Sequence, residues 1–179
     1  MKHLGPIELH TPRLLLRRYT PEDAVEVYKN WATDPLTSKF LSWNVHESVE
    51  ETRDIVGRWV ESYEDPAVYH WVLQYGDTLI GAISLHDISL KNERVEVGYC
   101  MGSKWWNQGL MTEALAAVIR FCFDELECHK VCGRFDTENI GSGRVMQKCG
   151  MQPEGILCQD YKRKDGSFGD MAMYGIVRE

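Results

Sequence analysis

Hydrophobic and polar positions follow two different periods along this chain, and the changes of period divide it into expected strands and helices. Where apolar residues recur at every second position between turn-forming residues, a strand is expected. The expected strands cover residues 14–19, 69–75, 78–86, 94–101, 130–136, 156–162 and 168–177. Gly76-Asp77 and Lys164-Asp165-Gly166 are typical hairpin turns, so the strands on either side of each turn should pair antiparallel.

Four other segments have helical spacing. Pro21 suits the first turn of a helix over residues 21–32, and Ser48 with Glu51 forms a capping box for the next helix. The longest apolar face steps through Met111, Leu115, Val118, Cys122 and Leu126. A shorter helix over residues 139–148 precedes Gly150, which should close it in the left-handed conformation.

The order of these elements predicts the fold class. Strands joined by hairpins, followed by a strand–helix–strand crossover, indicate a mixed, mostly antiparallel sheet with helices on its faces. The expected class is therefore α/β, of the α+β kind. Because the 179 residues contain no repeat, low-complexity tract or linker, one domain over residues 1–179 is expected.

The composition limits the partners of the protein. A formal net charge of −7 argues against binding nucleic acid through a broad basic face. No signal-peptide core and no apolar run near about 18 residues is present, so no membrane association is expected. Cys128, His129 and Cys132 could be metal ligands, but no second ligand pair follows them. We therefore expect a cytoplasmic protein with reduced thiols and no metal.

The start of the longest helix carries the strongest chemical signal. In "SKWWNQGLMTEAL", Gly109 stands where a helix usually has a capping Ser or Asp. The uncapped N–H groups and the positive end of the helix dipole can hold a phosphate, and a glycine lets the phosphate approach closely. A plain junction between a loop and a helix is the alternative interpretation.

Three segments, in the right order and at the right spacing, resemble the GNAT superfamily of acyl-CoA-dependent N-acetyltransferases. "TPRLLLRRYTPEDAVEVYKNWATDP" (residues 11–35) is similar to the opening of the branch that contains the ribosomal-protein-alanine N-acetyltransferases. "VEVGYCMGSKWWNQGLMTEAL" (95–115) resembles its fourth strand and coenzyme loop, and "ENIGSGRVMQKCGMQPEG" (138–155) resembles its Asn-x-x-Ser helix. The resemblance covers nearly the whole chain. It implies a GNAT-like sheet of about seven strands flanked by about four helices, with a splay between the fourth and fifth strands.

The same resemblance implies acetyl-CoA as the co-substrate. The coenzyme pyrophosphate would lie on the loop formed by Trp106, Asn107, Gln108, Gly109, Leu110, Met111 and Thr112. The pantetheine arm would run along Val97 and Tyr99, while Asn139 would contact that arm or cap its own helix. The superfamily pattern is Gln/Arg-x-x-Gly-x-Gly/Ala, so Trp106 and Met111 depart from it at the outer positions. Backbone donors do not depend on side-chain identity, and the coenzyme is still expected to bind.

Glu96 is the candidate catalytic base. An amine with a pKa near about 8 to 10 is mostly protonated at neutral pH and must lose a proton before it attacks. The matching strand acid serves as the base in several relatives. The alternative is a solvent-facing glutamate paired with Arg94 or Lys130. Gly98, on the same face of its strand, is expected at a bulge or at a point of close approach.

Ser142 is the second candidate catalytic residue, because its place in the Asn-x-x-Ser helix would let it protonate the departing thiolate. No cysteine has a His/Asp environment that would suit a covalent acetyl-enzyme. Direct attack of the amine on acetyl-CoA in a ternary complex is therefore expected.

The acceptor implied by the branch resemblance is the N-terminal amine of a protein or peptide. A small cationic amine, such as a polyamine, an aminoglycoside or an amino-acid derivative, is the alternative, and so is a non-catalytic acyl-CoA-binding protein. Residues 31–46 and 159–168 are expected to face the acceptor, and they carry Phe40, Trp43, His46 and Tyr161. The sequence leaves open whether the protein is a monomer or a homodimer.

Overall fold

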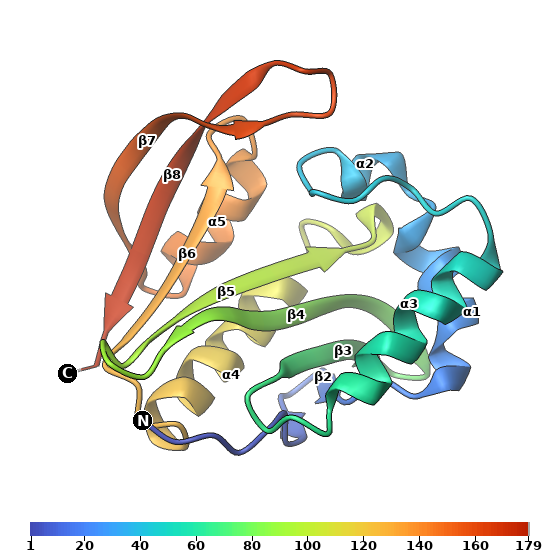
Figure 1. Ribbon diagram of the computed structural model, residues 1–179, viewed down its shortest axis with the longest axis horizontal. Coiled ribbons are helices and arrows are strands. Elements are labelled where there is room, and N and C mark those ends of the chain that lie inside the picture. Colours follow the sequence, from blue (N-terminus) through green and yellow to red (C-terminus); the bar gives the residue numbers. More distant parts are fainter. Residues whose placement is uncertain (179) are drawn as a thin grey trace.

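A computed structural model describes residues 1–178 and contains one sheet of eight strands, in the order β1-β2-β3-β4-β5-β6-β8-β7 (Figure 1). The strands are β1 (Leu9–His10), β2 (Leu14–Arg17), β3 (Tyr69–Tyr75), β4 (Thr78–Ser89), β5 (Arg94–Met101), β6 (Lys130–Asp136), β7 (Gln152–Lys162) and β8 (Phe168–Val177). Every neighbouring pair is antiparallel except β5 and β6. The predicted fold class, a mixed and mostly antiparallel sheet, is confirmed.

The helices are α1 (Ala24–Val27), α2 (Pro35–Ser38), α3 (Val49–Ser62), α4 (Leu110–Asp124) and α5 (Ile140–Lys148). The single helix expected over residues 21–32 consists of a 3-10 turn (Pro21–Asp23), α1 and a π turn (Tyr28–Ala32) in succession. Ser48 caps α3 as predicted, since its hydroxyl accepts a hydrogen bond from the Glu51 N–H. None of the helices within residues 1–178 combines the length and the apolar character needed to cross a membrane.

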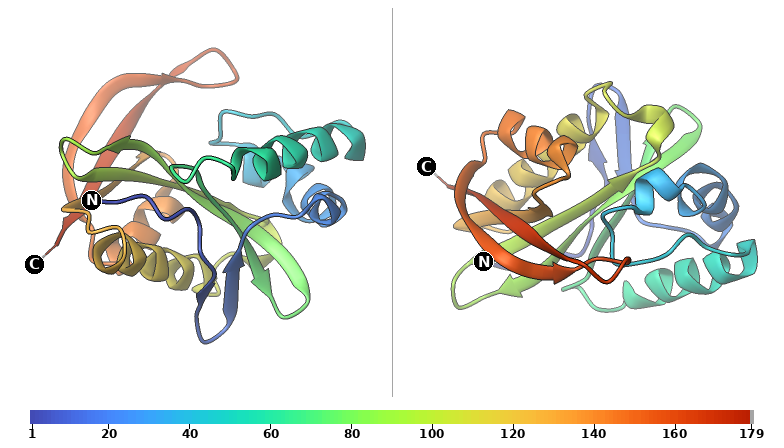
Figure 2. Two further views of the ribbon diagram at one scale, coloured as in Figure 1. Left: turned by 60° about the horizontal axis from the view of Figure 1, so that its bottom comes forward. Right: turned by 90° about the horizontal axis from the view of Figure 1, so that it is seen from above.

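The sheet has a core on each face. Helix α4 covers one face, where Leu115 and Val118 pack against strand residues such as Trp71. Helices α1 and α3 cover part of the other face, where Val27 and Val56 belong to a second, smaller cluster (Figure 2). Alternation along β5 is as predicted: Val95 and Val97 belong to the first core, whereas Cys100 packs against the second.

The parallel pair β5–β6 is hydrogen-bonded over only part of its length. Its register joins Arg94, Val95 and Glu96 to Lys130, Val131 and Cys132. Beyond Glu96 the two strands diverge, and Figure 1 shows β5 and β6 as the arms of a V. This divergence confirms the predicted splay between the fourth and fifth expected strands. The strand and helix counts rise to eight and five because the short β1 and α2 have too few residues to show a period.

The expected bulge at Gly98 is wrong. Gly98 pairs regularly with Ser84, and the irregularity in the β4–β5 ladder lies between His86 and Ser89 on the other strand. The expected close approach does occur, because a Cβ at Gly98 would stand 2.8 Å from Cε1 of His86. A side chain at this position would therefore collide with the imidazole ring.

Candidate active site

A cleft of about 620 Å³ lies between the diverging end of β5, the loop before α4, and helices α2 and α5. The predicted site residues that line this cleft are Tyr99, Trp106, Asn107, Gly109, Leu110, Met111, Thr112, Asn139 and Ser142. Two predicted coenzyme residues are not in its lining. The side chain of Val97 is buried in the main core, and the amide of Gln108 donates to the Lys104 carbonyl oxygen at 3.2 Å.

The loop before α4 has the backbone that the sequence predicted for a phosphate site. Gly109 is the N-cap residue with φ 75°, and no side chain caps the helix. Asn107 also has a positive φ, of 61°. The first helical hydrogen bond runs from the Glu113 N–H to the Gly109 carbonyl oxygen at 3.0 Å, so the N–H groups before Glu113 have no partner within the helix. This turn presents backbone donors to the cleft, as an anion site requires.

The structure places a cation beside this loop that the sequence did not reveal. Nη1 of Arg13 donates to the Gln108 carbonyl oxygen at 3.0 Å, and its Nε donates to Glu113 at 2.7 Å. Trp106 has no charge to offer, and its indole N–H donates to the Met101 carbonyl oxygen at 2.7 Å. Arg13 comes from a segment 95 residues before the loop, so no spacing within the loop could have indicated it.

Helix α5 supplies two further cations. Arg144 and Lys148 line the cleft and are four residues apart, which places them on the same side of the helix. Asn139 caps this helix, because its side-chain oxygen accepts a hydrogen bond from the Ser142 N–H at 3.3 Å. The capping interpretation of Asn139 is thus confirmed, while its contact with a coenzyme stays a prediction. The i, i+4 spacing of these two basic residues is visible in the sequence, but neither residue was among the predicted site residues.

Two hydroxyl groups meet across the cleft. Oη of Tyr99 on β5 lies 3.0 Å from Oγ of Ser142 on α5, and it donates to the Ser142 carbonyl oxygen at 3.0 Å. Burial raises the pKa of Tyr99 well above its usual value, so this hydroxyl keeps its proton at physiological pH. The pair therefore offers a proton donor within the diverging part of the sheet.

Glu96 lies on the opposite face of β5 and is only 4% exposed. Its Oε1 is 2.9 Å from Nε of Arg134 and 3.4 Å from Nε2 of His86. Burial alone would raise the pKa of Glu96, but the hydrogen bond from His86 and the charge of Arg134 lower it below its usual value. The alternative of a solvent-facing carboxylate is wrong, and Lys130 instead pairs with Glu154 at 2.6 Å.

The two segments expected to face the acceptor, residues 31–46 and 159–168, contact each other. Nζ of Lys164, in the β7–β8 hairpin, donates to the carbonyl oxygens of Ser38 at 2.7 Å and Trp43 at 2.5 Å. Phe40 lines the cleft. His46 belongs to the packing instead, since its Nδ1 lies 2.8 Å from the Thr52 hydroxyl and burial lowers its pKa.

A group of possible metal ligands lies on the face of the sheet that carries Glu96. One ligand atom from each of His86, Asp87 and Glu96 falls within 4.8 Å of the others. Arg134 lies 2.9 Å from Glu96 and 3.6 Å from Asp87, so a guanidinium charge already neutralises these carboxylates. A cation would have to displace that arginine, and the donor set therefore fits a metal poorly.

The sheet thus opens between two parallel strands, and a cleft lined by an uncapped helix start lies at this opening. The family model described as an acetyltransferase (GNAT) domain matches residues 13–152. The uncharacterized N-acetyltransferase YoaA of Bacillus subtilis is 30% identical over 172 residues, which are 95% of this chain and 96% of that protein. This chain belongs to the GNAT acetyltransferase family and is an N-acetyltransferase.

Two further comparisons concern ribosomal proteins. The ribosomal protein uS5-alanine N-acetyltransferase of Escherichia coli is 35% identical over 81 residues, which are 45% of this chain and 41% of that protein. The solved structure of RimL, a ribosomal L7/L12 alpha-N-protein acetyltransferase in complex with coenzyme A, matches with a TM-score of 0.83 at 19% identity. That match covers 96% of this chain and 98% of the RimL chain.

Proposed function

We propose that the protein transfers the acetyl group of acetyl-CoA to the N-terminal amine of a protein or peptide, by direct attack in a ternary complex. One observation carries this proposal. The opening beyond Glu96 has a cleft of about 620 Å³ on the α4–α5 side and a group of titratable side chains on the other side. A donor and an acceptor can therefore meet in the opening from opposite faces of the sheet.

The residues of the cleft fit acetyl-CoA. The uncapped start of α4 would hold the pyrophosphate, with Arg13 adding the positive charge that Trp106 lacks. Arg144 and Lys148 line the same cleft and would face the remaining phosphate. When bound, the coenzyme supplies an activated acetyl thioester. RimL and the acetyltransferase MccE, whose solved structures contain coenzyme A and acetyl-CoA, share this fold.

The chain's own residues would handle two protons. The acceptor ammonium must lose one before its nitrogen can attack, and the group around Glu96 lies where that proton would be taken up. The departing sulfur can receive a proton from the Tyr99–Ser142 pair, whose hydroxyls are 3.0 Å apart. No step requires a covalent acetyl-enzyme. Ser142 thus stays the predicted proton donor, and Glu96 belongs to the group proposed to receive the ammonium proton.

A protein N-terminus is favoured as acceptor because the uS5-alanine N-acetyltransferase and RimL, by their names, act on ribosomal proteins. The hydrogen bonds of Lys164 join the β7–β8 hairpin to residues 38–43. This bridge favours a narrow acceptor, such as an extended chain end or a small amine. A cytoplasmic location and the oligomeric state stay predictions.

A CoA-release assay tests this proposal. Peptides with free Ala or Ser N-termini, the same peptides with blocked N-termini, spermidine and an aminoglycoside would be compared under equal conditions. We expect free peptide N-termini to exceed the small amines at least about tenfold in kcat/KM, with blocked peptides inactive. A small amine as the best acceptor would overturn the substrate assignment, and the absence of turnover with every amine would overturn the activity.

A further inference from the structure

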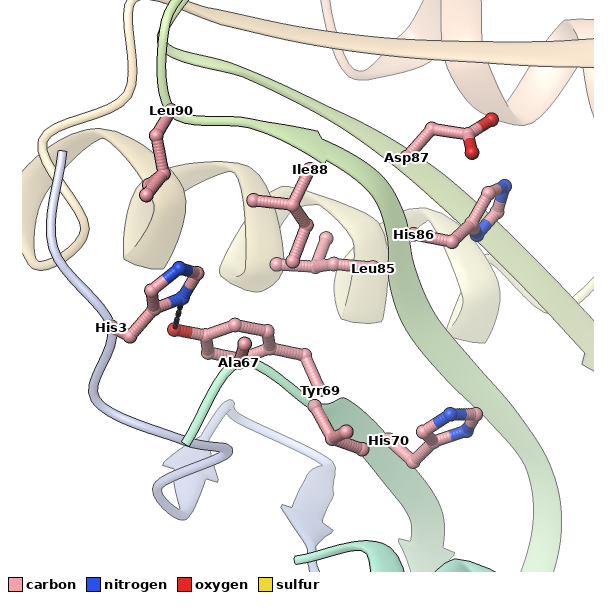
Figure 3. A pocket seen from close by; sticks show the side chains of 10 residues that line it. His3, Ala67, Tyr69, His70, Leu85, His86, Asp87, Ile88 and Leu90 are labelled. Carbon is pink, nitrogen blue, oxygen red and sulfur yellow. Dashed lines mark hydrogen bonds between the residues drawn. The ribbon is translucent and has the colours of Figure 1, made fainter. Parts of the chain in front are cut away.

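A bulge in β4 brings two consecutive side chains to the same side of the sheet. His86 pairs with Glu96, but the next registered pair is Ser89 with Arg94, and Asp87 has a φ of 46°. Regular alternation would send His86 and Asp87 to opposite faces. Instead, ligand atoms of both lie within 4.8 Å of Glu96, and Figure 3 shows both side chains pointing away from Leu85. Bulges re-aim side chains in this way next to functional sites.

The imidazole ring of His86 stands at the point where the sheet opens. Its Nε2 lies 3.4 Å from Oε1 of Glu96, the last residue of β5 that pairs with β6. The ring lies against Gly98, where a Cβ would approach its Cε1 to 2.8 Å. Glycine at this position leaves space for the ring beside the first residues of the splayed strand. The side chain of His86 is 44% exposed, so an acceptor arriving on this face can reach it.

Glu96 is poorly suited to taking up the proton itself. Its carboxylate is 5% exposed and lies 2.9 Å from the guanidinium of Arg134. A buried carboxylate that is paired with an arginine stays ionised and has little affinity for a proton. The same properties suit it to orienting a neighbouring imidazole and stabilising the imidazolium, as the aspartate of a catalytic triad does.

We propose that His86, and not Glu96, accepts the proton of the acceptor ammonium, and that Glu96, held by Arg134, is the positioning residue for His86. This inference rests on the proposed acetyl transfer and assigns one step of it. Histidine is the side chain whose ordinary titration range matches a base that works near neutral pH.

The protons and bonds balance. His86 takes one proton from the ammonium and passes it to solvent. The amine nitrogen forms a bond to the acetyl carbon while the carbon–sulfur bond breaks, and the sulfur keeps the electron pair. A second proton from the nitrogen ends on that sulfur as the thiol, by way of the Tyr99–Ser142 pair. The third proton stays on the amide product.

Charged and titratable groups surround His86 on four strands. They are His70 on β3, Asp87 on β4, Glu96 on β5 and Arg134 on β6. Asp87 is 57% exposed, and its carboxylate favours the approach of an ammonium ion. His70 stacks on Trp59 at a centroid distance of 5.9 Å and makes no ion pair with a carboxylate within residues 1–178, which makes it a matched control.

The test compares four proteins between about pH 5.5 and pH 10, using the best acceptor of the wild-type enzyme: wild type, His86→Gln, Glu96→Gln and His70→Gln. We expect His86→Gln to lose about 10² in kcat at neutral pH and to lose the acidic limb of its profile, with unchanged acetyl-CoA affinity. Glu96→Gln should keep an acidic limb, because this variant retains the imidazole of His86. His70→Gln should match the wild type.

A second variant keeps the test decisive if His86→Gln is poorly folded. His86→Ala leaves a solvent-accessible space, so added imidazole should restore turnover about tenfold or more, whereas Glu96→Gln should gain nothing. The inference is overturned if wild type turns over while His86→Gln keeps its rate and its acidic limb, or if imidazole restores nothing to a folded His86→Ala. A wild-type enzyme inactive with every amine would instead overturn the proposed function.

Discussion

The coenzyme side and the acceptor side of this protein are built in different ways. On the coenzyme side, the key turn spans the few residues from Trp106 to Leu110, and backbone N–H groups provide its donors. On the acceptor side, His86, Glu96 and Arg134 come from three strands and act through their side chains. In the proposed mechanism, backbone geometry would hold the donor, whereas the acceptor chemistry would depend on long-range side-chain contacts. Substitutions should therefore affect the two sides separately.

Glu96→Gln should give the largest effect and should confine it to the acceptor side. The amide cannot stabilise a positive charge on His86 and leaves Arg134 without its partner. We expect turnover at neutral pH to fall by about 10², with acetyl-CoA affinity nearly unchanged. Part of the loss should return toward pH 10, since free amine then becomes abundant. Steady-state rates measure the turnover, and calorimetry measures the acetyl-CoA affinity. Equal pH profiles for the wild type and Glu96→Gln would remove Glu96 from the mechanism.

Gly109→Val should weaken the coenzyme side alone. Gly109 has a φ of 75°, which a β-branched residue adopts with strain, and its Cβ would crowd the phosphate donors. We expect acetyl-CoA binding to weaken at least tenfold, or about 1.4 kcal/mol. Gly57→Val is the control, because a Cβ at Gly57 meets no atom within 4 Å. Unchanged calorimetric affinity in a folded Gly109→Val protein would place the phosphate elsewhere.

Arg13→Ala sharpens the comparison, because Arg13 is the long-range component of the coenzyme side. Its loss removes a positive charge near the turn and leaves the Glu113 carboxylate without the Arg13 guanidinium. We expect the Kd of coenzyme A to rise about three- to tenfold, with a smaller dependence on salt. Arg53→Ala, which breaks an exposed pair on α3, should change nothing. Similar Kd values for the two variants would show that Arg13 only supports the fold.

Lys164→Met should produce a smaller effect on the acceptor side. Methionine keeps the apolar stem but loses the hydrogen bonds to the Ser38 and Trp43 carbonyl oxygens. We expect the KM for a peptide acceptor to change about threefold, with no change in coenzyme affinity. Lys162→Met, on the same hairpin, is the matched control. An unchanged KM would show that the bridge does not shape the acceptor site.

Asp34→Asn should give the smallest effect of these substitutions, and that effect is a loss of stability. Asp34 lies where the two sides meet. Asp34 accepts hydrogen bonds from the Ser103 N–H and the Thr37 hydroxyl, both at 2.9 Å. Burial alone would raise the pKa of Asp34, but these bonds lower it from 3.8 to about 2. A depressed carboxylate pKa stabilises the folded protein above the unfolded value and loses this contribution as pH falls. Asp34→Asn should thus lower Tm by about 2–4 °C at pH 7, and this gap should shrink from about pH 4 toward pH 2.

Sequence patterns predicted most of the architecture. Strand and helix periods placed the main elements within a few residues, and the left-handed cap at Gly150 was found with φ 84°. The turn proposed to bind phosphate was also predictable, because the missing cap at Gly109 and the apolar steps behind it are local features. Such features depend on neighbours within one or two helical turns, so they can be predicted from the sequence directly.

The contacts that decide the chemistry were set only in the tertiary structure. Arg13 reaches a loop 95 residues away, and Arg134 neutralises Glu96 from another strand. The pairing of His86 with Glu96 depends on the register of β4 and β5, and the place of Asp87 beside them depends on a bulge that no period reveals. The period of the hydrophobic pattern shows which face of the sheet a residue occupies. The distance between side chains on two strands depends on strand register instead, and one inserted residue changes that register. The sequence alone therefore determined the uncapped turn at Gly109, while the position of His86, the proposed proton acceptor, followed from how distant strands align.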